Sequence, residues 1–507
     1  MGEFVSEFSY TRDGLFFFGQ FFRDGFIRCA KLFPVKAFLF FLFSCPFLFA
    51  QKQPNLLLIL ADDMGYGDLG CTGSTTIKTP NIDAIAERGI LCTQGYVPSS
   101  VCSPSRAGIL TGRDPRRFGY EGNLNKKGDA YPTPHDLQGL PSSEHTLADH
   151  LKAAGYSTAL IGKWHQGHLP QFHPNKRGFD HFYGMLNGNH TYFPTIQNNH
   201  LEQNGIPQTE FSSPYITGLF TDHAIEWIEQ QPRDQPWFLF ASYNAPHTPM
   251  EATAEDLARY QSIKNPKRRT YAAMMHALDR GVGRLVAQLR ESKQFDETLI
   301  VFLSDNGGAT NNGSWNGPLG GKKGSLREGG IRVPILFSWP GILPPGRIFE
   351  KPVSALDLLP TFLAAARTEP LPLKEAPNYE DSSNRRRAQK LYGDYDGQNL
   401  LSRFLSNDDD LESRTLFWRL QGQSALLRDD YKLVKLSHRP AQLFKPGQDP
   451  AEEEDLAISE DEKLKELFIL LGEWESSLAT VPLWGSSPFW AGDSAKIYDL
   501  PPSEEPR

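Results

Sequence analysis

The chain has 507 residues and a formal net charge of −8, with 39% hydrophobic and 22% charged residues. This length supplies enough apolar side chains for a large buried core and favours two domains. The acidic balance argues against nucleic acid as a general partner, because phosphate backbones are bound by clusters of Lys and Arg.

An apolar run over residues 37–50 follows basic residues near the amino terminus. Such a run is typical of a secretory signal segment and is short for a transmembrane helix. We therefore predict a leader over residues 1–50, cleavage after Ala50, export to the periplasm or the medium, and no stable membrane partner. A membrane anchor, or a lipoprotein signal at Leu42–Cys45, is the alternative interpretation.

Short apolar runs further along the chain each lead into polar residues that can carry chemistry. The runs are Asn55–Leu60, Ser157–Ile161, Trp237–Ser242 and Leu299–Ser304. Runs of this length suit buried strands of a largely parallel sheet. Helical patterns lie between them, over Thr146–Ala154, Asp222–Glu229 and Tyr271–Ser292. This alternation predicts an α/β sheet with helices on both faces, and ligands in such sheets bind beyond the carboxyl ends of the strands. The polar residues that follow the four runs are therefore expected to converge, and they are Asp62 with Asp63, Lys163 with His165, His247, and Asp305 with Asn306.

The sequence becomes polar and proline-bearing over Arg367–Lys390, after a further run at Val333–Trp339 and a helical pattern at Ala355–Ala366. We place a domain boundary there, between a catalytic domain over residues 51–390 and a smaller domain over residues 391–507.

The C-terminal domain is predicted to be α+β. Strands are expected at Ser424–Leu427 and Lys432–Lys435, followed by a helix capped by Ser459 together with Glu462. An apolar stripe on this helix is interpreted as packing, and it consists of Leu464, Leu467, Phe468, Leu471 and Trp474. The acidic run Glu452–Asp455 is interpreted as a solvated turn.

Two pairs of hard oxygen donors follow predicted strands, Asp62 with Asp63 and Asp305 with Asn306. No His–Cys zinc pattern occurs among them, so calcium or magnesium is favoured over a transition metal, with calcium preferred. An Asp-Asp pair is commonly a loop cap when it stands alone. Its position after a strand, with a second pair after another, favours a metal site here.

Residues 102–113 read Cys-Ser-Pro-Ser-Arg-Ala-Gly-Ile-Leu-Thr-Gly-Arg. Ser103 as cap and Pro104 as first helical residue predict a short helix over residues 104–110, with Cys102 just before its amino end. Backbone N–H groups and the helix dipole there favour an anion. A buried structural thiol is the other interpretation of Cys102.

This segment resembles the signature of the formylglycine-dependent sulfatases, an arylsulfatase-like family of the alkaline phosphatase superfamily. Similar family elements are Gly-Lys-Trp-His at residues 162–165, Ala-Pro-His-Thr-Pro around His247, and a lysine spaced from Glu-Gly-Gly at residues 328–330. The resemblance covers about residues 54 to 365, and the C-terminal domain more loosely. It implies a large mixed, mostly parallel sheet sandwiched by helices, with a smaller C-terminal α+β domain.

The resemblance also implies a modified side chain and a metal ion. A formylglycine-generating enzyme would convert Cys102 to formylglycine (3-oxoalanine), whose hydrate attacks sulfur with one hydroxyl and expels sulfate with the other. One Ca²⁺ would be held by Asp62, Asp63, Cys102, Asp305 and Asn306.

Further roles follow from the resemblance. Arg106 would steady the oxygens of the modified side chain, and Lys163 the sulfuryl oxygens. His165 would act as a base, while His247 and Lys323 would donate to the departing oxygen. The doubled lysine at residues 322 and 323 leaves the identity of the latter donor open.

The sequence is thus interpreted as an exported sulfatase that hydrolyses a sulfate ester of a carbohydrate, with Arg117–Gly139 and Gly188–Phe193 as segments that contact the sugar. A phosphonate or phosphate ester hydrolase of the same fold is the rival enzyme. A non-catalytic protein that binds sulfated glycans is the rival of another class. Cys71 and Cys92 either pair or stay as thiols.

Overall fold

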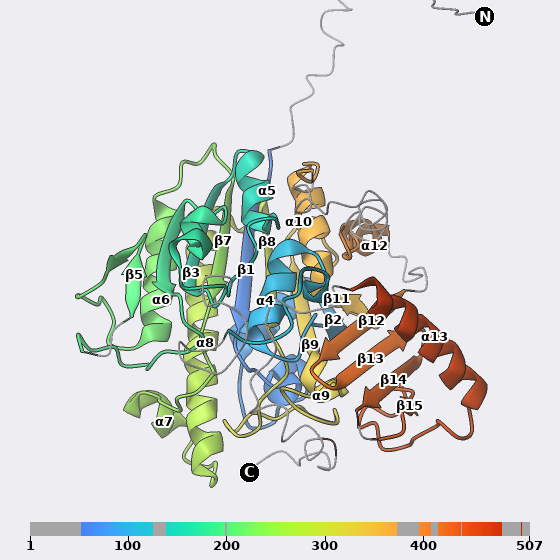
Figure 1. The fold of residues 1–507 in the computed structure, drawn as a ribbon. Coiled ribbons are helices and arrows are strands. Elements are labelled where there is room, and N and C mark those ends of the chain that lie inside the picture. The colour runs from blue at the N-terminus through green and yellow to red at the C-terminus, as the bar shows by residue number, and fades with distance from the viewer. Residues whose placement is uncertain are drawn as a thin grey trace, which may run out of the picture. The chain divides into compact units, whose positions relative to one another are not determined.

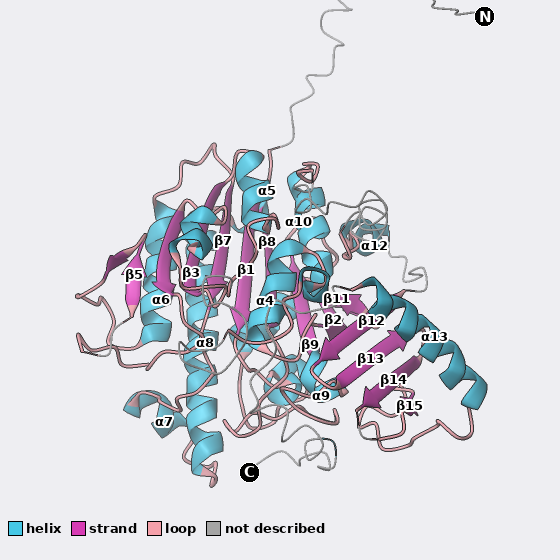
Figure 2. Ribbon diagram, viewed as in Figure 1, coloured by secondary structure: helices cyan, strands magenta, loops and turns pink. Residues whose placement is uncertain are grey.

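The computed structural model describes residues 52–124, 138–197, 200–372, 395–406, 414–437, 439–478 and 498. Across these residues, one mixed sheet of 11 strands carries helices (Figure 1), and a 4-stranded antiparallel sheet follows later in the chain (Figure 2). The predicted leader and the predicted boundary at residue 390 lie outside the described residues.

The middle of the large sheet is parallel, in the order β8–β1–β7–β3–β4. These strands are β1 (Asn55–Ala61), β3 (Ser157–Lys163), β4 (His181–Met185), β7 (Trp237–Ser242) and β8 (Thr298–Ser304). The four apolar runs predicted as strands are therefore confirmed.

The flanks of the large sheet contain the antiparallel pairs. On one side β9 (Arg332–Ser338) runs antiparallel to both β8 and β2 (Ile90–Tyr96). Two short strands then pair in parallel with β2, namely β10 (Arg347–Phe349) and β11 (Val353–Ser354). On the other side a hairpin follows β4, formed by β5 (Leu201–Gln203) and β6 (Ile206–Pro207).

Two hydrophobic cores lie on opposite faces of β1. Leu56, Leu58 and Leu60 pack in the core that includes α5 (Leu147–Ala153) and α10 (Leu358–Ala366). Leu57 and Ile59, which alternate with them, pack in the core that includes three other helices. These are α3 (Pro80–Glu87), α6 (Ile216–Glu229) and α8 (Pro266–Glu291). Successive side chains of a strand point to opposite faces, so the continuous apolar run reflects burial on both. Helices on both faces are confirmed.

Two of the predicted helices begin earlier than expected. The pattern at Asp222–Glu229 is the second half of α6, and α8 begins at Pro266, where Asn265 caps two backbone N–H groups. The remaining α-helices of the described main body are α4 (Cys102–Thr111), α7 (Ala254–Arg259), α9 (Glu328–Ile331) and α12 (Leu401–Ser406).

The C-terminal part has the predicted α+β character. It consists of β12 (Thr415–Leu420), β13 (Gln423–Arg428), β14 (Tyr431–Leu436), β15 (Gln442–Phe444) and α13 (Asp461–Ser477). The apolar stripe of α13 packs against this sheet, as expected, with Leu467 and Leu471 fully buried.

One expectation for this region is wrong, and the expected solvation of Glu452–Asp455 holds for Glu453, Glu454 and Asp455, which are exposed, but not for Glu452. Ser459 does not cap α13, which begins at Asp461 without a side-chain cap, and the Ser459 hydroxyl donates to the Leu456 carbonyl instead. Glu452 is not solvated but buried, and its carboxylate pairs with Lys432 at 2.8 Å. A local acidic pattern does not reveal a distant lysine on a neighbouring strand.

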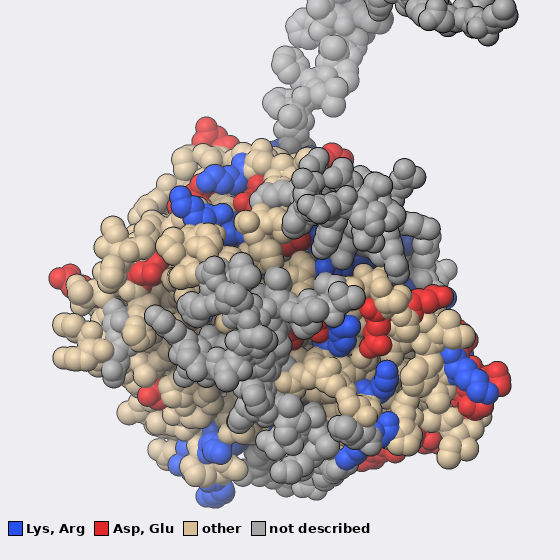
Figure 3. Space-filling view, in the orientation of Figure 1, with Lys and Arg blue, Asp and Glu red and all other residues tan. Residues whose placement is uncertain are grey.

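Cys71 and Cys92 are free thiols, which answers the open question of their pairing. No helix among the described residues combines the length and the apolar character needed to cross a membrane. On the face drawn in Figure 3, acidic and basic side chains of the described residues are interspersed.

Gly162 of β3 has no room for a side chain. Its φ is +117°, and a Cβ there would lie 1.9 Å from the Ser242 carbonyl oxygen of β7. We expect Gly162→Ala to lower the free energy of unfolding by at least about 2 kcal/mol, because strands β3 and β7 must separate. Chemical denaturation measures the change. Gly472→Ala is the control, since nothing lies within 4 Å of its Cβ position and it is in a helix; equal stability of both variants would contradict the prediction.

Candidate active site

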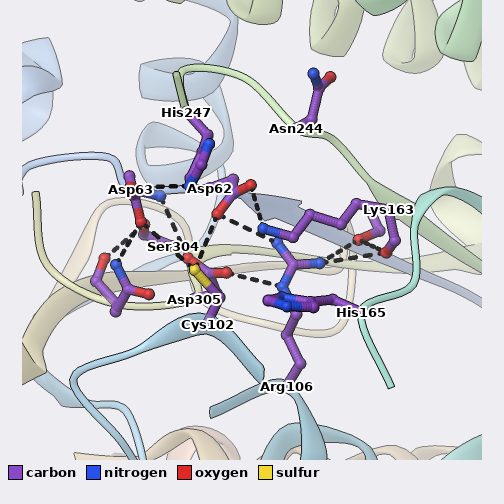
Figure 4. Close-up of polar contacts among 12 residues, drawn as sticks. Asp62, Asp63, Cys102, Arg106, Lys163, His165, Asn244, His247, Ser304 and Asp305 are labelled. Atoms are coloured by element: carbon purple, nitrogen blue, oxygen red, sulfur yellow. Dashed lines mark hydrogen bonds and ion pairs between the residues drawn. The ribbon is translucent and has the colours of Figure 1, made fainter. Parts of the chain in front are cut away.

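The predicted site residues converge at the carboxyl ends of the parallel strands (Figure 4). Asp62 follows β1 and Asp305 follows β8, and the strand register sets Ala61 opposite Ser304. Lys163 is the last residue of β3, and His247 lies beyond β7. The expectation that these polar clusters meet at one edge is therefore confirmed by geometry.

Cys102 lies at the centre of this cluster. Its Sγ is 3.5 Å from Asp62 Oδ1, 3.7 Å from Asp63 Oδ1 and 3.0 Å from Lys323 Nζ. Cys102 is the first residue of α4 and is buried, so it lies at the amino end of a helix as expected. Burial, which outweighs the attraction of Lys163 and Lys323, raises the pKa of the Cys102 thiol well above its usual range. The unmodified thiol is therefore not ionised at neutral pH.

The predicted cap at Ser103 is wrong. Helix α4 begins at Cys102, two residues earlier than predicted, and the preceding residue, Val101, offers no capping side chain. The Ser103 hydroxyl instead donates to the His165 carbonyl at 2.7 Å and contacts the Tyr120 hydroxyl at 2.5 Å. These tertiary partners satisfy the hydroxyl, and they connect the start of α4 to the segment that follows β3.

Each buried carboxylate of the site has a cationic partner. Lys163 Nζ is 2.6 Å from Asp62 Oδ2, and Lys323 Nζ is 2.6 Å from Asp63 Oδ1. Arg106 Nε donates to Asp305 Oδ2 at 2.8 Å. Ionised carboxylates this deeply buried require such partners, because desolvation disfavours the charged form.

The pKa values follow this pairing. Burial acts to raise the pKa of Asp62, but Lys163, His247 and Arg106 hold it well below its usual range. Lys323 and His247 likewise lower the pKa of Asp63 against the effect of burial. Burial and the Asp62 carboxylate raise the pKa of Asp305 to about 6, despite Arg106. The raised pKa of Asp305 thus reflects burial first and the neighbouring Asp62 carboxylate second, although each of the three carboxylates has a cationic partner.

Arg106 connects the ends of three strands. Besides Asp305 after β8, one of its terminal nitrogens donates to the Ser242 hydroxyl of β7 at 2.7 Å and to the Lys163 carbonyl of β3 at 3.3 Å. The guanidinium therefore lies between the ends of β3, β7 and β8 and fixes their spacing next to the carboxylate cluster.

His165 is buried and neutral. Burial, reinforced by Lys163 and Arg106, lowers its pKa well below the usual value. Its backbone adopts a left-handed conformation with φ +57°, and its carbonyl accepts from the Ser103 hydroxyl and from Gln166 Nε2. The imidazole Nδ1 is buried without a hydrogen-bond partner. A neutral imidazole in this place can accept a proton.

His247 lies on the side of the carboxylates that is opposite to Arg106 (Figure 4). Its Nδ1 donates to the Thr248 carbonyl at 2.7 Å, so that Nε2 is directed at Asp63 Oδ2, 3.5 Å away. Burial lowers the pKa of His247 in spite of the attraction of Asp62 and Asp63.

The geometry selects Lys323 over its neighbour. Lys323 Nζ lies between Asp63 and Cys102, whereas Lys322 is only half-buried and donates its backbone N–H to the Ser325 hydroxyl. Of the two lysines that the sequence left as alternatives, only Lys323 has its ammonium in the cluster.

The oxygen donors of the site fit a hard cation, and they lie together with the Cys102 sulfur and the His247 imidazole. Ligand atoms of Asp62, Asp63, Cys102 and His247 all lie within 4.8 Å of one another. The side-chain oxygen of Asn306 is buried without a hydrogen-bond partner, while its nitrogen donates to Asp63 Oδ1 at 2.8 Å. An unpartnered buried oxygen beside carboxylates is the arrangement that an added Ca²⁺ would satisfy. His247 was not expected among the candidate ligands.

Some site residues were missed by sequence reasoning. The Ser242 hydroxyl bridges Arg106 and the Lys163 carbonyl, and Asn244 is buried with an unpartnered side-chain oxygen. Both follow or end β7, so the rule that polar residues collect at strand ends was a usable signal.

The segment Gly188–Phe193 borders the site, as its expected role requires. A Cβ on Gly188 would lie 2.7 Å from the His165 ring, and the Tyr192 hydroxyl donates to the Asn244 and His247 carbonyls. Of the other expected segment, Arg117–Gly139, residues 125–137 lie outside the described residues.

Comparison with known proteins agrees with this site. The model of the sulfatase family matches residues 54–368. N-acetylgalactosamine-6-sulfatase of Sus scrofa is 37% identical over 338 residues, covering 63% of this chain and 64% of that protein. Arylsulfatase A of Homo sapiens is 37% identical over 351 residues, covering 64% of this chain and 66% of that protein. The matched region thus spans slightly less than two thirds of these relatives.

Among solved structures, Ps i-CgsB in complex with k-i-k-neocarrahexaose has a TM-score of 0.76 and 36% identity, covering 89% of this chain and 98% of that chain. This similarity confirms the predicted fold class. The family model covers more than half of the chain and includes the Cys102 helix and the strand-end residues around it. This protein therefore belongs to the sulfatase family.

Proposed function

We propose that the protein hydrolyses sulfate esters of a carbohydrate, with Cys102 converted to formylglycine and one Ca²⁺ bound beside it. The observation that carries the proposal is the position of Cys102. It is the first residue of a buried helix, 3.0 Å from the Lys323 ammonium and within 3.7 Å of the Asp62 and Asp63 carboxylates.

The environment of Cys102 favours a modified side chain. Burial raises the pKa of the thiol, so a thiolate nucleophile is scarce at neutral pH. Formylglycine would supply a hydrated carbonyl, with one hydroxyl for attack and the other for release of sulfate. The surrounding residues are arranged to bind an anion, since two lysines and an arginine meet the amino end of a helix there.

The charge and protonation state of each other site residue support a different proposed role. Lys163 and Arg106 would stabilise anionic oxygens, at about 3 kcal/mol for a preorganised donor. His165 is neutral and is proposed to accept a proton. Lys323 Nζ and the imidazolium form of His247 are proposed to donate to the departing oxygen, from the side of Asp63. Because Nδ1–H of His247 is held by the Thr248 carbonyl, Nε2 can donate only when the ring is protonated. Asp62, Asp63, Asp305 and Asn306, together with residue 102, would hold the Ca²⁺, which supplies positive charge against sulfate oxygens.

The carbohydrate substrate is supported by the comparisons and by one segment. Ps i-CgsB was solved with an oligosaccharide, and the Sus scrofa relative is a sulfatase of N-acetylgalactosamine. Gly188 lies against His165, Tyr192 donates to the His247 carbonyl, and the next residue, Phe193, is 41% exposed. An exposed aromatic side chain in such a segment suits the apolar face of a sugar. We further propose export through the leader and maturation by a formylglycine-generating enzyme.

Active protein should carry an aldehyde at residue 102. An aldehyde-reactive probe is expected to label the wild type, produced with the modifying enzyme, and not Cys102→Ala. Mass measurement of the peptide containing Cys102 gives the modified fraction. Full turnover by protein whose Cys102 is entirely a thiol would refute the nucleophile, and glycan binding without turnover would favour the non-catalytic alternative.

Asp305→Ala should lose both metal and activity, because it removes a hard ligand and leaves Arg106 without its partner. We expect bound Ca²⁺, measured by elemental analysis, to fall below half of the wild-type stoichiometry, and kcat/KM to fall at least about 100-fold. Asp222→Ala is the matched control, because Asp222 pairs with Arg284 on the surface. Normal metal content in Asp305→Ala would contradict the ligand assignment.

Lys323→Ala should lower kcat/KM more for a substrate with a poor leaving group than for one with a good leaving group. A sugar alkoxide needs a proton as the S–O bond breaks, so its kcat/KM is expected to fall roughly 100-fold or more, against less than about 10-fold for nitrophenyl sulfate. Lys322→Ala should leave both rates near the wild-type values. Equal losses on the two substrates would instead assign Lys323 to sulfate binding. Brisk phosphonate hydrolysis without sulfatase activity would favour the rival enzyme.

A further inference from the structure

The segment that carries Lys323 has little regular structure. Between Leu319 and the start of α9 at Glu328 the chain forms turns rather than a helix or strand. On the side of the main body, Lys323 N donates to the Gly308 carbonyl at 3.1 Å and Gly324 N to the Ser100 carbonyl at 2.9 Å, while Asn316 Nδ2 donates to the Gly321 carbonyl at 3.2 Å. We call residues 319–328 the Lys323 loop.

The C-terminal part of the chain contacts the same loop along its length. Gly320 N donates to the Pro450 carbonyl at 3.1 Å, and Glu328 N donates to Glu452 Oε2 at 2.7 Å. Between these ends, Gln423 Nε2 donates to the Gly324 carbonyl at 3.1 Å, directly after Lys323. The Tyr498 hydroxyl joins the two groups, since it accepts from Leu326 N and donates to Gln423 Oε1.

A buried charge network fixes these contacts. Lys432 of β14 lies 2.7 Å from Glu328 Oε1 and 2.8 Å from Glu452 Oε1, and the three side chains have exposed fractions of 0%, 0% and 1%. The Tyr96 hydroxyl of β2 donates to the second oxygen of Glu328. Breaking a buried ion pair leaves an uncompensated charge, so this network strongly favours one geometry.

The backbone of residues 450–452 lies so close to Gly320 that no side chain fits at this position of the Lys323 loop. A Cβ there would lie 2.1 Å from the Ala451 carbonyl oxygen, so the backbone of residues 450–452 lies directly on the loop. Figure 1 shows α9, which the loop enters, beside the C-terminal sheet.

We propose that Glu452 and Gln423 are positioning residues, through which the C-terminal part holds Lys323 Nζ at the reacting group. This inference rests on the proposed function, because it gives the Lys323 ammonium a role in the reaction. The C-terminal part then affects the activity of a site whose other named residues come from α4 and from the strand ends and following loops of the large sheet.

Hydrogen exchange tests the contacts without reference to activity. In Glu452→Ala the peptide covering residues 319–328 should exchange at least about 10-fold faster, because the Glu328 amide loses its charged acceptor. Glu453→Ala is the matched control, since Glu453 is the exposed neighbour in the same turn. Gln423→Leu is the second variant, which leaves the buried charges intact and decides the question if Glu452→Ala does not fold.

A double-mutant cycle tests the positioning role. Glu452→Ala and Gln423→Leu should each lower kcat/KM for a sulfated sugar by roughly 10-fold or more in the wild type, and by less than about 3-fold in a Lys323→Met background. If either variant lowers kcat/KM by the same factor in the Lys323→Met background as in the wild type, its effect does not pass through Lys323. That result would mean a general structural role and would overturn the proposal. Unchanged exchange and unchanged kcat/KM in both variants would overturn it too. A wild type without sulfatase activity would refute the proposed function, while the exchange experiment would still report on the contacts.

Discussion

The burial of Asp62, Asp63 and Asp305 at one sheet edge is the constraint on which the rest of the site depends. Parallel strands bring these carboxylates together, and removing them from water disfavours their charged forms. Lys163, Lys323 and Arg106 each lie within 2.8 Å of one of them. In the proposed function the same cations would also meet an anionic substrate, so one set of residues would provide both the charge balance of the folded protein and the chemistry of the site.

Much of this site could be predicted from the sequence. The strands are continuous apolar runs because both faces of the sheet are covered, and a polar residue at the end of such a run must lie at the edge. Asp62, Lys163, His247 and Asp305 were located in this way. The family motifs added Cys102 and its surroundings, which periodicity alone does not distinguish from a structural thiol.

What could not be predicted depends on partners that are distant in the chain. Ser103 is of a residue type that is preferred at helix N-caps, yet its hydroxyl donates to the carbonyl of His165, 62 residues away. Glu452 has the composition of a solvated turn, yet it is buried against Lys432. Local propensity is a weak prior in both cases, because a buried tertiary hydrogen bond or ion pair outweighs it. The contribution of the C-terminal part to the Lys323 loop was hidden for the same reason.

Arg106 has a consequence for how the enzyme responds to heat. A single guanidinium joins the ends of β3, β7 and β8, and its partners include the Asp305 carboxylate, the Ser242 hydroxyl and a backbone carbonyl. The polar edge is thereby assembled in the folded protein before any substrate arrives, and no ordering entropy is spent on binding. Loss of the Arg106 contacts requires separation of the central strands, so this part of the polar edge is expected to persist until the sheet itself unfolds.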